Sequence, residues 1–363
     1  MGKRDRWDSS SDEEEEAPKQ QQQPSSSTAT TTSDKHIPLH NPLLHGCRSV
    51  YDTYEQISHI SEGSYGVVWK ARDLFTNEIV ALKQVKLDDE NKDDGFPIAA
   101  LREINVLLAL SHDNIVSVRE MVVGNETVYM VLEYFAMDLK QGLDRYPGAL
   151  AQAELKSLLQ QILAGVAHIH AHSYLHRDLK TTNVLVHVSG RVAVADFGLA
   201  KQHSCSGDRA LTPLVVTLWY RAPELLLGEV HYGTPVDVWS VGCILGELIT
   251  REAILQGQGE LDQLDRIFAL VGTPTPETWP GYESLPNAGM FRWKPKKERL
   301  LSTKFPVAAP VSGNQAFLDR HGYDLLSRLL TLDPKQRITA QEALDHAYFQ
   351  QGVKPQVPRF FTE

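Results

Sequence analysis

The chain has 363 residues, with 36 Lys and Arg against 46 Asp and Glu, which gives a formal net charge of −10. This acidic balance argues against a protein that binds nucleic acid by general attraction to phosphates. The length predicts about two domains or lobes. No apolar stretch approaches the roughly 20 residues of a membrane span, and the three cysteines are too scattered for a disulfide framework or a CxxC metal site. We therefore expect an intracellular, soluble protein without a direct nucleic-acid or membrane partner.

The first segment, residues 1–48, differs in composition from the rest of the chain. It contains a serine run, an acidic run, a glutamine run and a Ser/Thr tract. Such a segment holds too little apolar surface to offset the entropy lost on ordering. We expect a disordered acidic tail here, followed by globular chain from Tyr54 onward.

The globular part begins with short β-branched segments and continues with helices. Strands are predicted at residues 66–70, 78–85 and 127–134, and helical spacing is found over residues 97–110, 155–172 and 236–249. The last helix is apolar nearly all round, which is typical of a helix in the core. A strand-rich first part and a helix-rich second part predict an α+β protein with two unequal lobes. Because lobe boundaries often hold ligands, we expect a site near residues 133–138.

Two patterns in the strand-rich part indicate phosphate binding. Gly63 and Gly66 lie in a turn between two strand-like runs, where glycine lets the backbone approach a phosphate without an intervening side chain. Lys83 lies in an otherwise apolar strand, and a buried ammonium must find an anion. Glu103 in the following helix is the candidate partner. The alternatives are a purely structural turn and a lysine that points outward from an edge strand.

The strongest pattern is the segment HRDLKTTN at residues 176–183. Asp178, Lys180 and Asn183 place a proton acceptor, a cation and an amide oxygen in one loop. Asp196, after the predicted strand 192–194, adds a second carboxylate. Carboxylate and amide oxygens together with substrate phosphates are the usual ligands of Mg²⁺. The pattern therefore indicates a site for a hard cation such as Mg²⁺.

In this order along the chain, these segments resemble those of eukaryotic protein kinases. The resemblance covers residues 54–349 and implies a bilobal protein kinase fold. It implies a small β-rich lobe at about 54–134, a larger helical lobe at about 139–349, and a C-terminal extension at 350–363. ATP and Mg²⁺ are the implied cofactors.

The resemblance also implies a role for each residue of the pattern. Lys83 would hold the α- and β-phosphates and pair with Glu103, and Asp178 would accept the proton of the substrate hydroxyl. Lys180 would contact the transferred phosphate, whereas Asn183 and Asp196 would hold Mg²⁺. Two structural roles are implied as well: Arg337 is the expected buried partner of Glu224, and Asp237 would brace the catalytic loop.

The nucleotide site implied by the resemblance draws on both lobes. Its residues are Ile60, Ser61, Glu62, Gly63, Ser64, Tyr65, Gly66, Val67, Val68, Ala81, Lys83, Glu133, Phe135, Asp138 and Leu185. Glu133 and Phe135 would bond adenine through their backbones, and Asp138 would meet the ribose. Ser61 departs from the family pattern, which has glycine there. Because serine tolerates extended backbone, we expect a modest loss of ATP affinity at most.

Within protein kinases, two segments resemble the cyclin-dependent group. They are FPIAALRE at residues 96–103 and TLWYRAPE at residues 217–224. The first resembles the PITSLRE subfamily, with Ala99 and Ala100 in place of Thr-Ser. This resemblance implies a cyclin-like regulatory subunit and substrates with Ser or Thr followed by Pro. It also implies a role in cell-cycle, transcription or RNA-processing control, in the nucleus rather than the cytoplasm.

Regulatory phosphorylation sites follow from the same resemblance. Thr212 would be an activating site, with a phosphate cage of Arg102, Arg177 and Lys201. Inhibitory sites would fall on Ser64 and Tyr65. For all three hydroxyl groups the alternative is an ordinary exposed side chain.

Other classes of protein fit the sequence less well. A MAP-kinase-like enzyme, also proline-directed, would normally carry a Thr-x-Tyr pair, but residues 211–214 contain no tyrosine. A pseudokinase scaffold would lack one of Lys83, Asp178 or Asp196, and all three are present. A P-loop small-molecule kinase needs GxxxxGK[ST], which is absent from the sequence. The sequence therefore predicts an active serine/threonine protein kinase.

Overall fold

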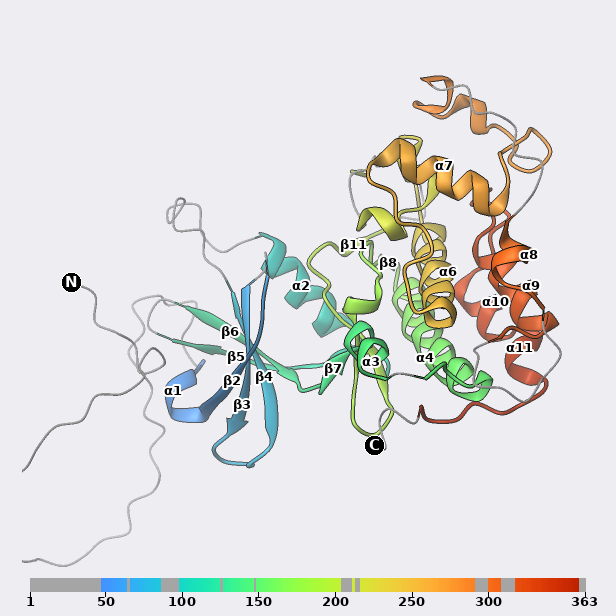
Figure 1. Cartoon of the computed structure of the whole chain (residues 1–363). Coiled ribbons are helices and arrows are strands. Elements are labelled where there is room, and N and C mark those ends of the chain that lie inside the picture. The colour runs from blue at the N-terminus through green and yellow to red at the C-terminus, as the bar shows by residue number, and fades with distance from the viewer. Residues whose placement is uncertain are drawn as a thin grey trace, which may run out of the picture. The chain divides into compact units, whose positions relative to one another are not determined.

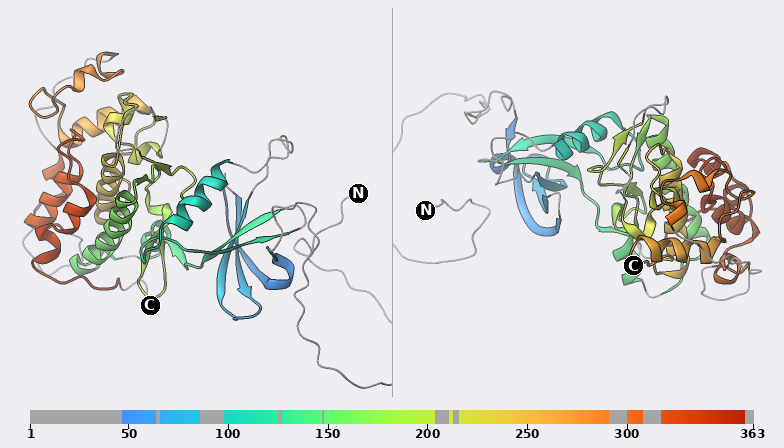
Figure 2. Two further views of the ribbon diagram at one scale, coloured as in Figure 1. Left: turned by 180° about the vertical axis from the view of Figure 1, so that it is seen from behind. Right: turned by 90° about the horizontal axis from the view of Figure 1, so that it is seen from above.

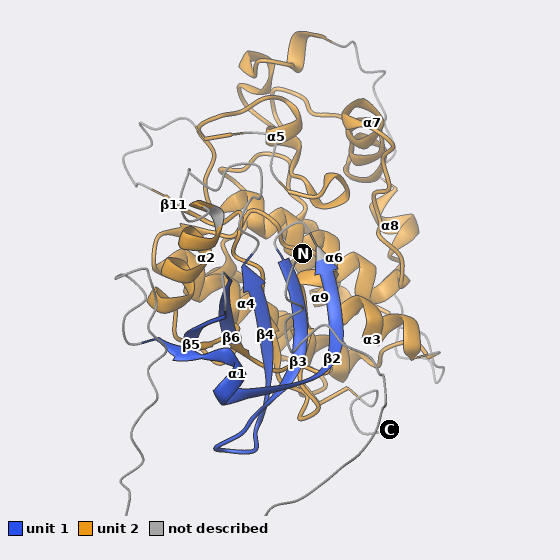
Figure 3. Ribbon diagram, turned by 90° about the vertical axis from the view of Figure 1, so that its left-hand side faces the viewer, with its two compact units in different colours: residues 1–86, 120–131 blue, residues 87–119, 132–363 orange. Residues whose placement is uncertain are grey.

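The computed structural model describes residues 47–63, 66–85, 98–124, 127–146, 148–203, 211–212, 216–290, 300–307 and 317–358. The predicted tail, up to residue 46, and the predicted phosphorylation sites Ser64 and Tyr65 lie outside these residues. The chain divides into two compact units (Figure 3), termed here the small unit, residues 1–86 and 120–131, and the large unit, residues 87–119 and 132–363. None of the helices that the structure describes is both long and apolar enough to cross a membrane.

The small unit is built on a six-stranded sheet with the strand order β1-β5-β6-β4-β3-β2 (Figure 1). Strands β2, β3 and β4 are antiparallel neighbours, and β1 pairs with β5 in parallel. Both β5 and β6 extend from the small unit into the large one. The elements are β1 (Arg48–Ser49), α1 (Val50–Thr53), β2 (Tyr54–Gly63), β3 (Gly66–Asp73), β4 (Ile79–Val85), β5 (Val118–Val123) and β6 (Val128–Glu133). The three predicted strands are confirmed as β3, β4 and β6.

The core of the small unit begins before the segment that resembles protein kinases. Val50 and Tyr54 are buried together with residues from four strands, namely Ala71, Val80, Leu82, Val122 and Val131. The buried apolar side chain of Val50 anchors α1, and residues 48–49 add a strand next to β5. Residues 48–53, which form β1 and α1, therefore belong to the folded part of the small unit.

The large unit is mainly helical. Its helices are α2 (Ile98–Ala109), α3 (Leu139–Arg145), α4 (Gln152–Ala171), α5 (Pro223–Leu226), α6 (Pro235–Thr250), α7 (Glu260–Val271), α8 (Leu301–Lys304), α9 (Arg320–Leu329), α10 (Ala340–Leu344) and α11 (Ala347–Gln350). The three predicted helices are confirmed as α2, α4 and α6. Helices α4 and α6 pack against each other, and α9 and α10 add further contacts to them (Figure 2). Residues 236–248 of α6 are all buried, as a sequence that is apolar nearly all round predicts.

Short strands and 3-10 turns of the large unit carry the segments predicted to do chemistry. A three-stranded sheet has the order β10-β9-β7, and β11 pairs with β8. The strands are β7 (Met137–Asp138), β8 (Tyr174–Leu175), β9 (Val184–Val186), β10 (Val192–Val194) and β11 (Lys201–Gln202); the turns are η3 (Thr181–Asn183), η4 (Leu218–Tyr220), η5 (Tyr282–Ser284) and η6 (Ala288–Met290). The predicted strand at 192–194 is therefore confirmed, and residues 176–183 connect β8 to β9.

The chain after α11 is bound along helix α4. The buried ammonium of Lys156 donates to the carbonyl oxygens of Gln351, at 2.6 Å, and Val353, at 3.1 Å. It also lies 4.8 Å from the centre of the Tyr348 ring. Gln356 then donates its N–H to the carbonyl of Ala153 at 3.0 Å. Burial lowers the pKa of Lys156, and the two carbonyls supply the acceptors that a buried ammonium needs. The predicted C-terminal extension is thus docked on the large unit as far as residue 358.

Candidate active site

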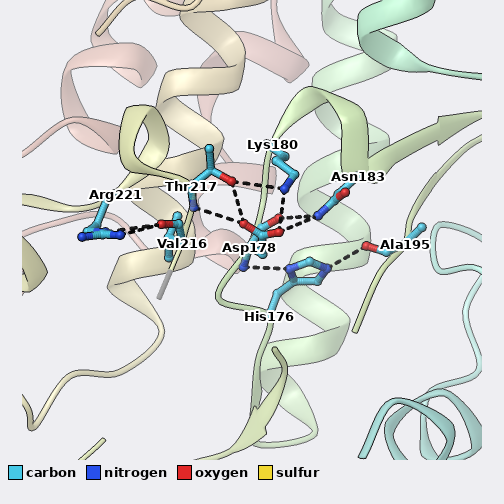
Figure 4. A network of polar contacts seen from close by, with 8 residues as sticks. All are labelled: His176, Asp178, Lys180, Asn183, Ala195, Val216, Thr217 and Arg221. Carbon is cyan, nitrogen blue, oxygen red and sulfur yellow. Dashed lines mark hydrogen bonds and ion pairs between the residues drawn. The ribbon is translucent and has the colours of Figure 1, made fainter. Parts of the chain in front are cut away.

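The carboxylate of Asp178 is the centre of a network of polar contacts in the large unit (Figure 4). The side chain is only 6% exposed. One carboxylate oxygen accepts hydrogen bonds from the backbone N–H and the hydroxyl of Thr217, at 3.1 and 3.0 Å. The other accepts from Lys180 Nζ at 2.8 Å and Asn183 Nδ2 at 3.0 Å. Two predicted site residues, Lys180 and Asn183, therefore donate to the carboxylate of a third, Asp178. Together with Thr217 they fix the orientation of that carboxylate.

Asp237 of α6 holds the backbone of this loop. Its carboxylate accepts from the N–H groups of His176 and Arg177, each at 2.9 Å, and from His170 Nε2 at 2.9 Å. Burial opposes the negative charge, but the hydrogen bond and charge of His170 and the other donors together hold the pKa of Asp237 below its usual value. Arg177 has a positive φ of 65°, an uncommon conformation for a residue with a side chain. The predicted brace is confirmed, and it stabilises a backbone that would otherwise be unfavourable.

His176 links the same loop to the segment that contains Asp196. Its Nδ1 accepts from the backbone N–H of Asp178 at 3.2 Å, so its Nε2 carries the proton and donates to the carbonyl of Ala195 at 3.0 Å. The ring also packs edge-on against Phe197, with 4.9 Å between centroids. The loop and the segment after β10 are therefore held together.

Asn183 and Asp196 have the properties expected of metal ligands. Because Asn183 Nδ2 donates to the carbonyl and the carboxylate of Asp178, its side-chain oxygen faces away from them. Asp196 Oδ1 is a buried carboxylate oxygen that accepts no hydrogen bond from the residues that the structure describes. The Ala195 N–H donates to the Asn183 carbonyl at 2.9 Å, which ties the two positions together. A buried carboxylate oxygen without a hydrogen-bond donor and an amide oxygen are both ligand types that suit a hard cation such as Mg²⁺.

The predicted nucleotide residues are divided between the two units. In the small unit, β2 exposes Ile60, Ser61 and Glu62, whereas β3 and β4 place Val67, Val68 and Lys83 in half-buried positions and bury Ala81. Gly66 has a positive φ of 138°, which favours glycine.

In the large unit, Glu103 and Phe135 are buried, and Leu185 pairs with Asp138 in the sheet register. Asp138 begins helix α3, where its carboxylate accepts from the N–H of Gln141 at 2.8 Å. Burial raises the pKa of Asp138. Lys83 belongs to the small unit and Glu103 to the large unit, so their proposed ion pair stays a prediction.

A model of the protein kinase domain matches residues 54–349 of the chain. The chain belongs to the protein kinase family. The match confirms the resemblance found in the sequence and the predicted kinase fold, with its N-terminal sheet and largely helical C-terminal region. A protein kinase domain implies ATP as the phosphoryl donor.

Named relatives are cyclin-dependent kinases and similar enzymes. Cyclin-dependent kinase G-2 of Oryza sativa subsp. indica is 47% identical over 88% of this chain and 44% of its own length. Cyclin-dependent kinase 11B of Homo sapiens is 44% identical over 90% of this chain and 40% of its own length. Serine/threonine-protein kinase ppk23 of Schizosaccharomyces pombe is 46% identical over 88% of this chain and 78% of its own length. The resemblance to the cyclin-dependent group and its PITSLRE subfamily is confirmed, although the chain spans less than half the length of several of these relatives.

In this kinase the segment before α5 contacts the predicted catalytic loop through Thr217 and Asp178. Helix α5 itself is held to the core. Glu224 forms a bidentate ion pair with Arg337, at 2.7 and 2.9 Å, with both side chains almost fully buried. The predicted partnership of these two residues is confirmed. Val216 has a positive φ of 68°, which is unusual for a β-branched residue, and its carbonyl accepts two hydrogen bonds from Arg221, at 3.1 and 3.3 Å.

The three predicted cage residues all lie in the large unit, and the phosphate cage itself stays a prediction. Arg102 and Lys201 line a pocket of about 300 Å³ beside α2, but Arg177 is not part of its lining. Arg177 instead donates to the carbonyl of Leu199 at 2.8 Å and to the hydroxyl of Tyr232 at 3.0 Å. Tyr232 in turn donates to the carbonyl of Thr212 at 2.6 Å, and the Thr212 side chain is exposed.

Sequence reasoning missed two residues of the network. Thr217, which lies in the segment TLWYRAPE, donates twice to Asp178 from 39 residues away. Tyr232 connects Arg177 to the Thr212 backbone and has no charge that would mark it. The resemblance of residues 217–224 to the cyclin-dependent group was a signal for Thr217; no sequence pattern pointed to Tyr232.

Proposed function

We propose that this chain is an ATP-dependent serine/threonine protein kinase. The arrangement of Lys180, Asn183 and Thr217 around the Asp178 carboxylate is the observation that carries the proposal. Asp178 would orient the substrate hydroxyl and accept its proton, which are contributions of position and of general base catalysis. Lys180, within 2.8 Å of that carboxylate, would balance the charge of the phosphate in transfer.

The remaining residues would hold the nucleotide. Asn183 and Asp196 would bind Mg²⁺, which supplies neutralisation of phosphate charge when bound. Lys83 with Glu103 would hold the α- and β-phosphates, and the backbones of Glu133 and Phe135 would bond adenine. The glycine loop of residues 60–68 would cover the phosphates, as the family resemblance implies.

We further propose that the substrate residue after the phosphorylated one is proline. Val216 precedes Thr217, so a hydroxyl bound at Asp178 would place the following substrate residue beside Val216. The Val216 carbonyl is already bonded by Arg221 and cannot accept a substrate N–H. A buried N–H without an acceptor is costly, whereas proline has no N–H to satisfy. This argument supports Ser-Pro and Thr-Pro substrates.

A pair of peptides that differ only in Ser-Pro or Ser-Ala tests this proposal. We expect kcat/KM to favour the Ser-Pro peptide by about tenfold or more, because an unsatisfied N–H costs about 1–3 kcal/mol. Arg221→Ala should reduce that preference, since it frees the Val216 carbonyl. Glu260→Gln is the matched control, because it removes only the ion pair of Arg221 with Glu260. Equal rates on both peptides would leave a kinase that is not proline-directed. Absence of transfer from ATP to any peptide by the partner-bound chain would contradict the kinase proposal.

A cyclin-like regulatory subunit is proposed to bind helix α2. The relatives are named cyclin-dependent kinases, and α2 exposes three apolar side chains, Ile98, Leu101 and Leu108, with Ile98 74% exposed. A partner that binds only the active state shifts the population by its differential affinity. Moving a ratio of 1:99 to 99:1 takes about 5.5 kcal/mol, a preference that a protein interface can supply. The proposed cell-cycle, transcription or RNA-processing role rests on the same resemblance.

The activity of the purified chain tests the need for this partner. With Thr212 phosphorylated and no partner present, we expect peptide phosphorylation to be nearly absent. In a preparation with the partner bound, Ile98→Asp should abolish binding and activity together. Val188→Asp, at another exposed apolar position, is the control and should change neither. Full activity of the isolated chain, unaffected by Ile98→Asp, would contradict cyclin dependence and leave the kinase proposal standing.

A further inference from the structure

Arg191 binds the segment proposed to hold adenine by three separate contacts. Its guanidinium forms an ion pair with the Glu133 carboxylate. It also donates from Nη1 to the carbonyl of Asp113 at 2.8 Å. The same planar group lies over the Phe135 ring, 5.0 Å from its centre. One side chain thus contacts both ends of residues 133–135 and the loop that follows α2.

The backbone of Arg191 is itself firmly held. Arg191 follows Gly190 in the turn between β9 and β10, where the His187 N–H donates to the Arg191 carbonyl at 2.8 Å. Gln161 of α4 donates to the Gly190 carbonyl at 3.1 Å and accepts from the Val192 N–H at 2.8 Å. Gly190 has a positive φ of 83°, which favours glycine, and a Cβ atom there would meet the side chain of Val357 in the C-terminal extension. Arg191 therefore starts from a position fixed by α4 and by the docked C-terminal residues.

The ring of Phe135 is bounded on two sides by this one turn. Arg191 lies over its face, and the ring of His187 meets it edge-on, with 6.0 Å between centroids. The backbone on either side is also fixed, because the Glu133 N–H donates to the Ser117 carbonyl and the Ala136 N–H to the Val186 carbonyl. The groups proposed to bond adenine, the Glu133 carbonyl and the Phe135 N–H, lie between these two anchors.

We propose that Arg191 is a positioning residue for ATP, which holds Glu133 and Phe135 so that their backbone groups meet adenine in place. This inference rests on the proposed function, because it assumes that residues 133–135 bind the nucleotide. A guanidinium suits the role better than an ammonium, since it can pair with a carboxylate, donate to a carbonyl and stack on a ring at once. Its loss should affect nucleotide affinity more than the chemical step.

The test measures ATP binding to the full chain by calorimetry, without reference to catalysis. Arg191→Ala should weaken the Kd for Mg²⁺-ATP by about 3- to 10-fold, the combined effect of a partly exposed ion pair and a cation–π contact. Arg191→Lys should be intermediate, because lysine keeps the charge and loses the planar contacts. Glu133→Gln removes the charge of the other partner in the same ion pair and should also weaken the binding of Mg²⁺-ATP. In Arg328→Ala, the control, an exposed ion pair on α9 is removed and binding should stay unchanged.

Steady-state kinetics separate positioning from a general structural role. The KM for ATP should rise by the same factor in Arg191→Ala, with kcat and the KM for peptide unchanged. Unchanged ATP affinity in both Arg191→Ala and Glu133→Gln would overturn the inference, as would a fall in kcat without a rise in the KM for ATP. If the wild-type chain binds ATP but phosphorylates no peptide even with the partner bound, the proposed function fails, and weaker ATP binding by Arg191→Ala would still support the role of Arg191.

Discussion

The predicted catalytic loop and the predicted glycine loop differ in how they are held. Residues 176–183 carry buried side chains, such as His176 and Asp178, whose partners Ala195 and Thr217 come from other parts of the large unit. Strands β2 and β3 form a hairpin in which residues 57–62 of β2, among them Ile57 and Ile60, are exposed. The pairing of β2 with β3 shifts register twice, between Gln56 and Ser58 and between His59 and Ser61.

Because the two regions are held differently, we expect them to tolerate different substitutions. A side chain in the catalytic loop has partners that cannot follow it if it changes, because they belong to other packed elements. A side chain in β2 has mainly solvent and its neighbouring strand around it. We therefore expect large effects in the loop and small ones in the hairpin, except where the backbone needs glycine.

The largest effect is expected for Asp178→Asn. The amide keeps the shape of the carboxylate but cannot accept the hydroxyl proton, and general base catalysis typically contributes about 10²- to 10⁴-fold. Phosphoryl transfer should fall by that factor, whereas the Kd for ATP should stay within about threefold. Single-turnover kinetics and calorimetry measure the two. Asp144→Asn, at an exposed ion pair on α3, is the control. Near wild-type turnover would show that Asp178 is not the base.

Asp237→Asn should damage both stability and activity. Three donors share the Asp237 carboxylate, and an amide cannot accept all three. Leaving a buried donor unsatisfied costs about 1–3 kcal/mol, so the free energy of unfolding should fall by that amount. Activity should fall at least about tenfold, because Arg177 loses the bond that holds its unusual backbone conformation.

The pH dependence of unfolding provides a second readout for Asp237. Its pKa in the folded state lies below the ordinary aspartate value of about 3.9. The stability that the charged form contributes is therefore present above that ordinary value and is lost as the pH falls through the folded-state pKa. Urea unfolding from neutral to acid pH should show a smaller loss of stability in Asp237→Asn than in the wild-type chain. Parallel pH profiles would contradict this role.

A smaller effect, about tenfold, is expected for Thr212→Ala in a preparation with the partner bound. A phosphate on Thr212 would add about −1.5 to −2 charge and three acceptor oxygens that basic side chains can bind. Arg177 can join them because its bonds to Leu199 and Tyr232 use only Nε and Nη1 of the guanidinium. Thr212→Ser, which can still be phosphorylated, is the matched control and should keep its activity in a peptide assay. Equal activity of all three proteins would remove Thr212 from the activating sites.

The smallest effect is expected in the hairpin, for Ser61→Gly. Ser61 is exposed in β2 opposite Val68, in extended backbone that serine tolerates. Restoring the family glycine should change the KM for ATP by about fivefold at most, since Gly and other residues differ by about 0.5–1 kcal/mol within a strand. Gly66→Ala should raise that KM more, because Gly66 has a φ of 138°. A larger effect of Ser61→Gly than of Gly66→Ala would reverse the comparison.

The family, strands β3, β4, β6 and β10, helices α2, α4 and α6, and the set of residues in the loop were predictable from the sequence. These depend on short spacings: Asp178, Lys180 and Asn183 lie within six positions of one another, and helices α4 and α6 follow from apolar periodicity or its absence. The pairing of Glu224 with Arg337 and the brace by Asp237 were also predicted, although only through resemblance to known kinases.

Which side chains meet across long stretches of the sequence is seen only in the tertiary structure. Thr217 reaches Asp178 across 39 residues, and Arg191 reaches Glu133 across 58. Lys156 reaches the carbonyls of the C-terminal extension across nearly 200 residues. No local pattern encodes these contacts, because they form only after burial of apolar surface has packed α4, α6 and the short strands together. Polar groups that are buried by that packing must then find partners wherever the chain has brought them.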